Sequence, residues 1–186
     1  KDAVLAAEDA RFYQHGGVDY KGVARAALEN LRDARSQGAS TITQQLVKNV
    51  LIPEAERFLR DPTDIATYNR KARELILSVE VSNRYSKREI LEWYLNGNNY
   101  GSLAYGVEAA AETYFGKHVQ DLDLTECATL AAIPQYPALN PADAPQAAQE
   151  RRNIVLDQML LQGYITPEEA LAAKATKLRV TPKRFD

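Results

Sequence analysis

The sequence predicts an all-α fold, and three observations support this class. Apolar residues recur at helical spacing along most of the chain. Ser or Thr followed three positions later by Glu marks two helix starts as capping boxes. Only residues 178–181 resemble a strand. We therefore expect a compact domain of many helices, with one irregular lobe at about residues 50–65.

Four helices are expected in the first half of the chain. The first covers residues 2–14 and stops at Gly16-Gly17, and Asp19 caps the second. Ser40 or Thr41 caps the third, which runs to about residue 50. The fourth is a long helix that starts at Asp61-Pro62, where a proline occupies the first helical position, and ends at Tyr85.

The second half is also expected to be helical. Ser86 and Glu89 form a capping box for a helix over 87–95, and a glycine- and asparagine-rich loop follows. Thr125 is expected to cap a helix over 126–133. The remaining helices are expected at 104–115, at 143–162 and after the capping box of Thr166 and Glu169.

The composition excludes several classes of protein. The 186 residues contain 23 Lys and Arg against 25 Asp and Glu, a formal net charge of −2, and 45% are hydrophobic, which is typical of a folded globular chain. The near-zero charge argues against a general nucleic-acid binder. The single cysteine, Cys127, excludes an intramolecular disulfide. The net charge of the whole chain nevertheless conceals a basic segment, because residues 70–88 carry six basic side chains and two acidic ones.

The two ends of the chain resemble cuts in a longer protein. The N-terminus shows neither the basic nor the apolar region of a signal peptide. The longest stretch without charge, residues 127–142, is broken by prolines and does not reach the ~18 apolar residues of a spanning helix. Lys1 begins in what the pattern predicts to be mid-helix, and residues 177–186 resemble the start of a linker to a further domain.

A first candidate site lies near the N-terminus. Glu8, Phe12 and His15 fall at i, i+4 and i+7, so one helix would present them on one face. A carboxylate on an apolar face beside an aromatic ring is desolvated, which raises its pKa toward the range of a general acid or base. The alternative is a solvated Glu8 and a structural His15, and the spacing alone favours this alternative.

A second candidate site is the polar helix start at residues 40–45. Free N–H groups at a helix N-terminus, together with two hydroxyl groups, suit an anionic oxygen such as that of a phosphate. Lys48 lies about two turns after Thr41 on the same face and could add a charge. The alternative is an ordinary Ser/Thr cap with a polar exposed face.

Arg70, Lys71 and Glu74 form a third candidate site. Their i, i+4 and i, i+3 spacing places two cations and one carboxylate on one helix face. The simplest interpretation is a solvated ion pair worth a few tenths of a kcal/mol. A net-positive helix beside a helix N-terminus also suits a pyrophosphate.

Two further segments are expected to be structural. Ile90, Trp93 and Tyr94 form an apolar stripe that we interpret as scaffolding. Arg151 and Arg152 are expected on a solvated face of a helix that buries Val155 and Leu156.

In this order and spacing, the five segments resemble the peptidoglycan glycosyltransferase domain (glycosyltransferase family 51) of class A penicillin-binding proteins and monofunctional transglycosylases. The similarity covers about residues 2–172. It is carried by Glu8-Asp9-x-x-Phe12-x-x-His15-x-Gly17, Gly38-x-Ser40-Thr41-x-Thr43-Gln44-Gln45 with Lys48-Asn49, Arg70-Lys71-x-x-Glu74, Glu89-Ile90-Leu91-Glu92-x-Tyr94-Leu95-Asn96 and Arg151-Arg152-x-x-Val155-Leu156.

The resemblance implies a lysozyme-like fold with a head lobe and a smaller jaw lobe, at about residues 50–68, that dips into the membrane surface. The family polymerises lipid II at the outer face of the bacterial cytoplasmic membrane. The donor is a glycan strand on undecaprenyl pyrophosphate, the acceptor is the 4-hydroxyl of lipid II, and the product is an inverted β-1,4 bond. A glycosyltransferase domain over 1–176 and a membrane anchor upstream are implied. The parent is left open between a bifunctional protein with a tethered transpeptidase and a monofunctional one, and residues 177–186 favour the bifunctional parent. The apolar candidates for bilayer contact are Leu51, Ile52, Phe58 and Leu59.

The resemblance also assigns roles to individual residues. Glu8 is similar to the general base of the family. Glu74 is similar to a second carboxylate near the donor pyrophosphate, where it could orient cations or a divalent Mg²⁺ or Mn²⁺. No organic cofactor is implied. Lys48, Arg70 and Lys71 would neutralise the leaving pyrophosphate. The donor side would be lined by Ser40, Thr41, Gln44, Gln45 and Asn49, and the Glu8 segment would be shaped by Asp9, Phe12 and His15.

Three departures from the family pattern are visible. Ala39 replaces a second glycine, and Asn99 stands where an aromatic residue is usual, so the loop around it receives no role. The segment between Asn49 and Arg70 is longer than usual, which leaves the pyrophosphate-binding arginine open between Arg57 and Arg60, with Arg57 preferred.

Two other functions stay open at this point. A glycoside hydrolase also uses two carboxylates in a helical domain, but a hydrolase has no pyrophosphate that would call for three cations. A non-catalytic module that binds membranes or partners would have no need for both carboxylates.

Overall fold

The computed structural model describes residues 1–30, 40–59, 61 and 63–181, with the backbone alone at 26–30. Ala39 and Arg60 lie outside the described residues. The described part is helical and contains no sheet; its one β-bridge joins Asn99 and Tyr105. The all-α prediction is therefore confirmed. The predicted strand at 178–181 does not form, and the N–H of Thr181 instead donates to the carbonyl of Tyr114 at 2.8 Å.

The chain divides into two compact units, which are described separately. The first contains residues 1–10 and 95–186, and the second contains residues 11–94. Helix α6 (Lys87–Gly97) crosses the boundary between them. The expected jaw segment, residues 50–68, belongs to the second unit. None of the helices within the described residues combines the length and the apolar character needed to cross a bilayer.

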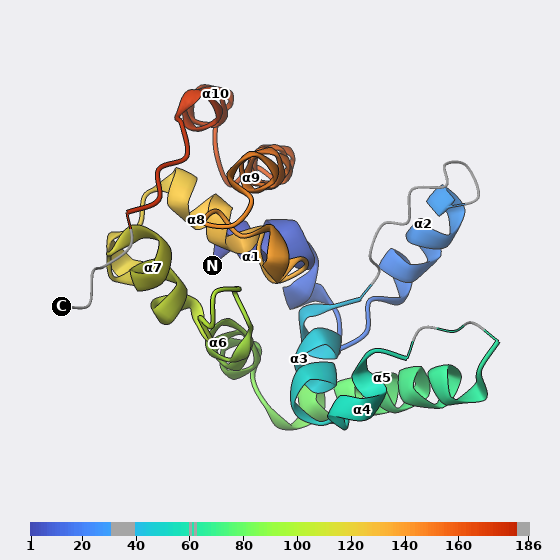
Figure 1. Ribbon diagram of the computed structural model, residues 1–186. Coiled ribbons are helices and arrows are strands. Elements are labelled where there is room, and N and C mark those ends of the chain that lie inside the picture. Colours follow the sequence, from blue (N-terminus) through green and yellow to red (C-terminus); the bar gives the residue numbers. More distant parts are fainter. Residues whose placement is uncertain (31–39, 60, 62, 182–186) are drawn as a thin grey trace. The chain divides into compact units, whose positions relative to one another are not determined.

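The first unit is built around α9, which packs against α1, α8 and α10 (Figure 1). A buried cluster that includes Tyr100, Tyr114, Leu130 and Ile133 fills the space where α7 meets α8. Its helices are α1 (Asp2–Glu8), α7 (Val107–Phe115), α8 (Leu124–Ala131), α9 (Pro145–Leu161) and α10 (Pro167–Ala175), with 3-10 turns η2 (Val119–Asp121) and η3 (Pro137–Leu139).

The second unit is built on the contact between α3 and α5, and α4 touches both (Figure 1). Ile42, Val47 and Ile52 are buried there. Its elements are the 3-10 turn η1 (Phe12–Gln14), α2 (Tyr20–Asn30), α3 (Ile42–Val50), α4 (Glu54–Arg57) and α5 (Ile65–Arg84).

The capping predictions are confirmed at four helices. Thr41 with Gln44 and Thr166 with Glu169 form capping boxes. The carboxylate of Asp19 accepts a hydrogen bond from the N–H of Gly22 at 2.9 Å. The remaining one is the box before α6, where the N–H of Ser86 donates to Glu89 at 2.9 Å.

Two predicted caps lie at the wrong residue. Helix α5 is capped by Asp64 instead of Asp61, because Asp61 is occupied by the N–H and hydroxyl of Thr63. Helix α8 is capped by Asp123, which forms a box with Glu126, whereas Thr125 is buried inside the first turn.

The prediction of one helix over residues 2–14 is wrong. Helix α1 ends at Glu8, because Asp9 leaves the helical region with φ −158° and ψ 75°. Phe12 then enters η1 and is buried in the second unit. Glu8, Phe12 and His15 therefore do not share a helix face. Gly16-Gly17 ends no helix either, and both residues lie in a bend.

Candidate active site

The cationic site predicted on α5 is present. Glu74 is 2% exposed, and its carboxylate is held by two cations from its own helix. Arg70 donates to Oε1 of Glu74, and Nζ of Lys71 lies 3.1 Å from Oε2. Both ion pairs have the predicted spacing. The simple interpretation of a solvated pair is wrong, because the carboxylate and Arg70 are largely withdrawn from water.

Lys71 links this site to the start of α3. Its Nζ donates a hydrogen bond to Oγ of Ser40 at 3.3 Å, across 31 residues of sequence. Arg70 also donates to the carbonyl of Leu59 at 3.2 Å. The structure thus brings the second and third predicted motifs together, with Lys71 the more exposed of the two cations.

The start of α3 is held by its own polar side chains. The hydroxyl of Thr41 accepts from the N–H of Gln44 at 3.1 Å, and Oε1 of Gln44 accepts from the N–H of Thr41 at 3.0 Å. The same hydroxyl donates to the carbonyl of Gly17 at 2.6 Å. Thr41 and Gln44 are buried. These contacts fix where α3 begins and therefore where Ser40 lies.

The other predicted donor-side residues lie farther along α3 or on α4. Oε1 of Gln45 accepts from the hydroxyl of Tyr94 at 3.1 Å. Ile90 and Tyr94 are buried, as expected for scaffolding, whereas Trp93 is 42% exposed. Nζ of Lys48 lies 5.9 Å from the centre of the Phe58 ring. Asn49 is exposed. Arg57 donates from Nε to the carbonyl of Ile52 at 2.8 Å.

The apolar residues predicted for bilayer contact divide into two groups. Phe58 is 71% exposed, and Leu51 is exposed as well. Leu59 is partly buried. Ile52 is 2% exposed, so its prediction as a membrane-facing residue is wrong: its side chain fills the interior of the second unit.

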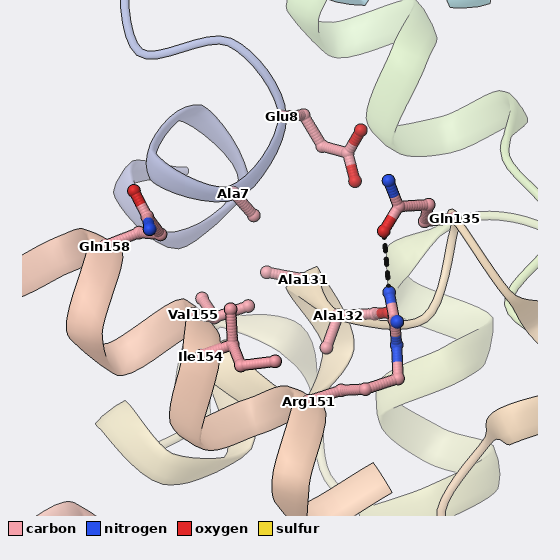
Figure 2. A pocket seen from close by; sticks show the side chains of 9 residues that line it. All are labelled: Ala7, Glu8, Ala131, Ala132, Gln135, Arg151, Ile154, Val155 and Gln158. Atoms are coloured by element: carbon pink, nitrogen blue, oxygen red, sulfur yellow. Dashed lines mark hydrogen bonds between the residues drawn. The ribbon is translucent and has the colours of Figure 1, made fainter. Parts of the chain in front are cut away.

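Glu8 stands at the C-terminal end of α1, in the first unit, and lines a pocket (Figure 2). The polar side chains around this pocket are those of Glu8, Gln135, Arg151 and Gln158, and the remaining wall is apolar. Figure 2 shows the carboxylate of Glu8 and the amide of Gln135 directed toward one another. Asp9, the next residue, is buried.

Two arginines of α9 take different positions. Arg152 is fully buried and donates to the carbonyls of Thr176 at 2.7 Å and Lys174 at 3.2 Å, at the end of α10. The prediction that Arg152 lies on a solvated face is wrong, because these carbonyls replace water. Arg151 lines the Glu8 pocket and donates to Oε1 of Gln135 at 2.8 Å.

Sequence reasoning missed Arg151 and Gln135 as site residues. Arg151 was visible as part of a motif, but its spacing pointed only to an exposed helix face. Gln135 lies in the proline-containing segment between α8 and α9, which carries no signal of function. Their proximity to Glu8 depends on the packing of α9 against α1.

The predicted group around Glu8 is divided between the units. Phe12 and His15 belong to the second unit, where their ring centres lie 6.3 Å apart. The ammonium of Lys87 lies 4.3 Å from the centre of the Phe12 ring. Glu74 is also in the second unit, so the two predicted carboxylates are contributed by different units.

The charge of Glu8 also acts on the phenol of Tyr100. Burial and the nearby Glu8 carboxylate raise the pKa of Tyr100, in that order of importance. The Tyr100 hydroxyl is buried and has no hydrogen-bond partner among the described residues. Tyr100 therefore stays a neutral phenol near Glu8.

The side chains around Glu74 do not fit a metal ion. Both of its oxygens face cations, which repel a further positive charge. A different group has ligand atoms within 4.8 Å of one another, namely Glu108, Glu112 and His118 in the first unit. Glu108 and His118 are exposed and Glu112 is partly buried, and Nδ1 of His118 lies 2.6 Å from Glu108.

Comparison with known proteins places the chain in a family. The model of the transglycosylase family matches residues 1–160. The chain is 47% identical over 170 residues to penicillin-binding protein 1A of Aquifex aeolicus, and the aligned region covers 90% of this chain and 22% of that protein. It is 45% identical over 179 residues to a protein of Cupriavidus necator named as a transglycosylase, covering 96% of this chain and 73% of that protein.

A solved structure supports the same assignment. The crystal structure of penicillin-binding protein 1A from Haemophilus influenzae matches with a TM-score of 0.52 and 43% identity, over 55% of this chain and 15% of that one. The chain is thus a helical domain of the transglycosylase class with a lysozyme-like fold. It belongs to the transglycosylase family, the peptidoglycan glycosyltransferases, and spans about a fifth of the length of the penicillin-binding proteins that it matches.

Proposed function

We propose that this domain polymerises lipid II into β-1,4 glycan strands, with undecaprenyl pyrophosphate as the leaving group. The observation that carries the proposal is the buried Glu74, which holds Arg70 and Lys71 beside Ser40. A buried carboxylate that fixes two cations at a helix start creates a preorganised positive site. Such a site suits a pyrophosphate, whose negative charge grows as it leaves.

The donor is proposed to bind on the second unit. Lys71 and Lys48 would contact the pyrophosphate, because their side chains retain exposure to water. Arg70 would act through its charge. The polar side chains expected to line this side are those of Ser40, Thr41, Gln44, Gln45 and Asn49, with Arg57 as the preferred jaw arginine.

Glu8 is proposed as the general base. Its carboxylate would take the proton of the acceptor 4-hydroxyl while that oxygen forms a bond to the anomeric carbon of the donor. The bond between this carbon and the pyrophosphate oxygen breaks, and the pyrophosphate leaves with the electron pair. Attack from the opposite face inverts the anomeric centre. Asp9, Phe12 and His15 are proposed to shape the acceptor side.

The partners and location are proposed on the family assignment. They are lipid II, the growing strand, the outer face of the bacterial cytoplasmic membrane and a tethered transpeptidase. The exposed Phe58 and Leu51 support membrane contact by residues 50–68. A divalent cation stays a prediction that EDTA treatment tests. No step above depends on one, since the groups around Glu74 do not fit a metal.

The decisive test replaces Glu8 by Gln, which keeps the shape and removes the base. Polymer formation from lipid II should disappear while the thermal unfolding curve stays unchanged. Retained polymerisation by a folded Glu8→Gln variant would remove Glu8 from the mechanism. The hydrolase alternative is tested with preformed glycan: shortened glycan without new polymer from lipid II would overturn the transferase proposal.

A further inference from the structure

The side chains beside Glu8 form an ordered chain of contacts that the proposed mechanism does not yet use. Arg151 is fixed on three sides. Its Nε donates to the carbonyl of Ala132 at 3.2 Å, its NH2 group donates to Oε1 of Gln135 at 2.8 Å, and its guanidinium carbon lies 4.3 Å from the centre of the Tyr136 ring. These contacts leave the guanidinium little freedom to turn.

The fixed guanidinium determines how the amide of Gln135 is oriented. A guanidinium has donors and no acceptor, so only the amide oxygen can face Arg151. The NH2 group of Gln135 must then point the opposite way. Figure 2 shows this NH2 group directed toward the carboxylate of Glu8.

We propose that Gln135 and Arg151 are positioning residues for Glu8. Arg151 fixes the orientation of the Gln135 amide, and the NH2 group of that amide donates a hydrogen bond to the Glu8 carboxylate during the reaction. A donor to a carboxylate favours its ionised form and fixes its direction. A general base needs both, since it must be ionised before it takes the acceptor proton. The inference rests on the proposed role of Glu8.

The other ionisable groups near Glu8 include Arg151, Tyr100 and Asp9. Helix α9 contributes Arg151, which donates to Gln135, and α8 contributes only Ala131 to the pocket. Tyr100 lies near Glu8, and Asp9 follows it in the sequence. Burial lowers the pKa of Arg151, whereas Tyr136 and Glu8 act to raise it, and the guanidinium stays charged at neutral pH.

The test begins with Gln135→Met, which keeps the length of the side chain and removes both polar groups. Gln135 is exposed, so the variant should fold. The Glu8 pKa, measured by NMR on carboxyl-labelled protein, should rise by roughly 0.5 to 1 unit. The Glu8→Gln variant identifies the Glu8 signal. Gln146→Met, an exposed change on the first turn of α9, is the control and should leave this pKa unchanged.

Kinetics give the second readout. In Gln135→Met the acid limb of kcat/KM should move to higher pH, and kcat should fall about tenfold with KM for lipid II within about twofold. Arg151→Met should shift the limb in the same direction. The double variant should be no slower than Gln135→Met, because Arg151 acts through Gln135.

The outcomes separate this inference from the general-base proposal. An unchanged Glu8 pKa and pH profile in Gln135→Met would overturn the inference even where Glu8→Gln is inactive. Additive losses in the double variant would overturn the link through Gln135. An active Glu8→Gln variant would overturn the general-base role, whereas the NMR result would still show whether Gln135 contacts Glu8.

Discussion

Lys71 lies one turn before Glu74 on α5, and its Nζ is 3.1 Å from Oε2 of that carboxylate and 3.3 Å from the hydroxyl of Ser40. One ammonium group thus joins the long helix of the second unit to the start of α3. The buried carboxylate fixes the direction of the cation, and the exposed part of Lys71 remains available to an anionic ligand.

Replacing Lys71 by Ala should reduce kcat/KM for lipid II by on the order of 100-fold, because one preorganised donor at the leaving pyrophosphate is lost. Thermal stability should change little, since Arg70 still pairs with Glu74. Arg84→Ala, an exposed change at the end of the same helix, is the control. An equal loss of binding for an acceptor analogue without pyrophosphate would contradict the assigned role.

Glu74→Gln should destabilise the fold by about 3 kcal/mol, because it leaves the mostly buried Arg70 without its counter-charge. Glu56→Gln is the matched control. It breaks the more exposed pair with Arg73 and should cost less than about 1 kcal/mol. Urea unfolding measures both values. If the two substitutions lowered the free energy of unfolding by the same amount, burial of the α5 pair would add nothing to the stability that the pair contributes.

The sequence predicted those features that depend on neighbours along one helix. Capping boxes and the pairs of Glu74 with Arg70 and Lys71 need only residues three or four positions apart, which helix geometry brings together. The contact between Lys71 and Ser40 spans 31 residues, and the pocket joins Glu8 to Arg151. Such contacts depend on helix packing, which no local pattern encodes.

The end of α1 at Glu8 shows that a local pattern can also predict a helix that does not form. Local spacing favoured a helix through residue 14, but burial of Phe12 in the second unit draws the chain out of helical geometry at Asp9. Tertiary burial therefore overrode a helical pattern. The burial of Arg152 was missed for a related reason, because its partners are carbonyls at the end of another helix.

Gly17→Ala should destabilise the protein by about 2 to 4 kcal/mol. Gly17 has φ +93°, and an added Cβ would lie 2.2 Å from the backbone oxygen of Ser78 on α5. Gly16→Ala is the matched control, since an added Cβ there meets nothing within 4 Å. Chemical unfolding should therefore give a lower free energy of unfolding for Gly17→Ala than for Gly16→Ala. Equal stability of the two variants would disprove the close approach of Gly17 to α5.

The contact between His118 and Glu108 should make stability depend weakly on pH. The hydrogen bond to Glu108, and then its charge, raise the pKa of His118 above 6.5. A raised folded-state pKa means that the stabilisation is fully present below pH 6.5 and is lost as the pH rises through the folded value. The melting temperature of the wild type should therefore be higher than that of His118→Gln, and this difference should be larger at pH 6 than at pH 9. Glu108→Gln removes the charged partner and should make this difference in melting temperature smaller at pH 6. A difference between wild type and His118→Gln that does not change with pH would show that the imidazole is not stabilised by this carboxylate.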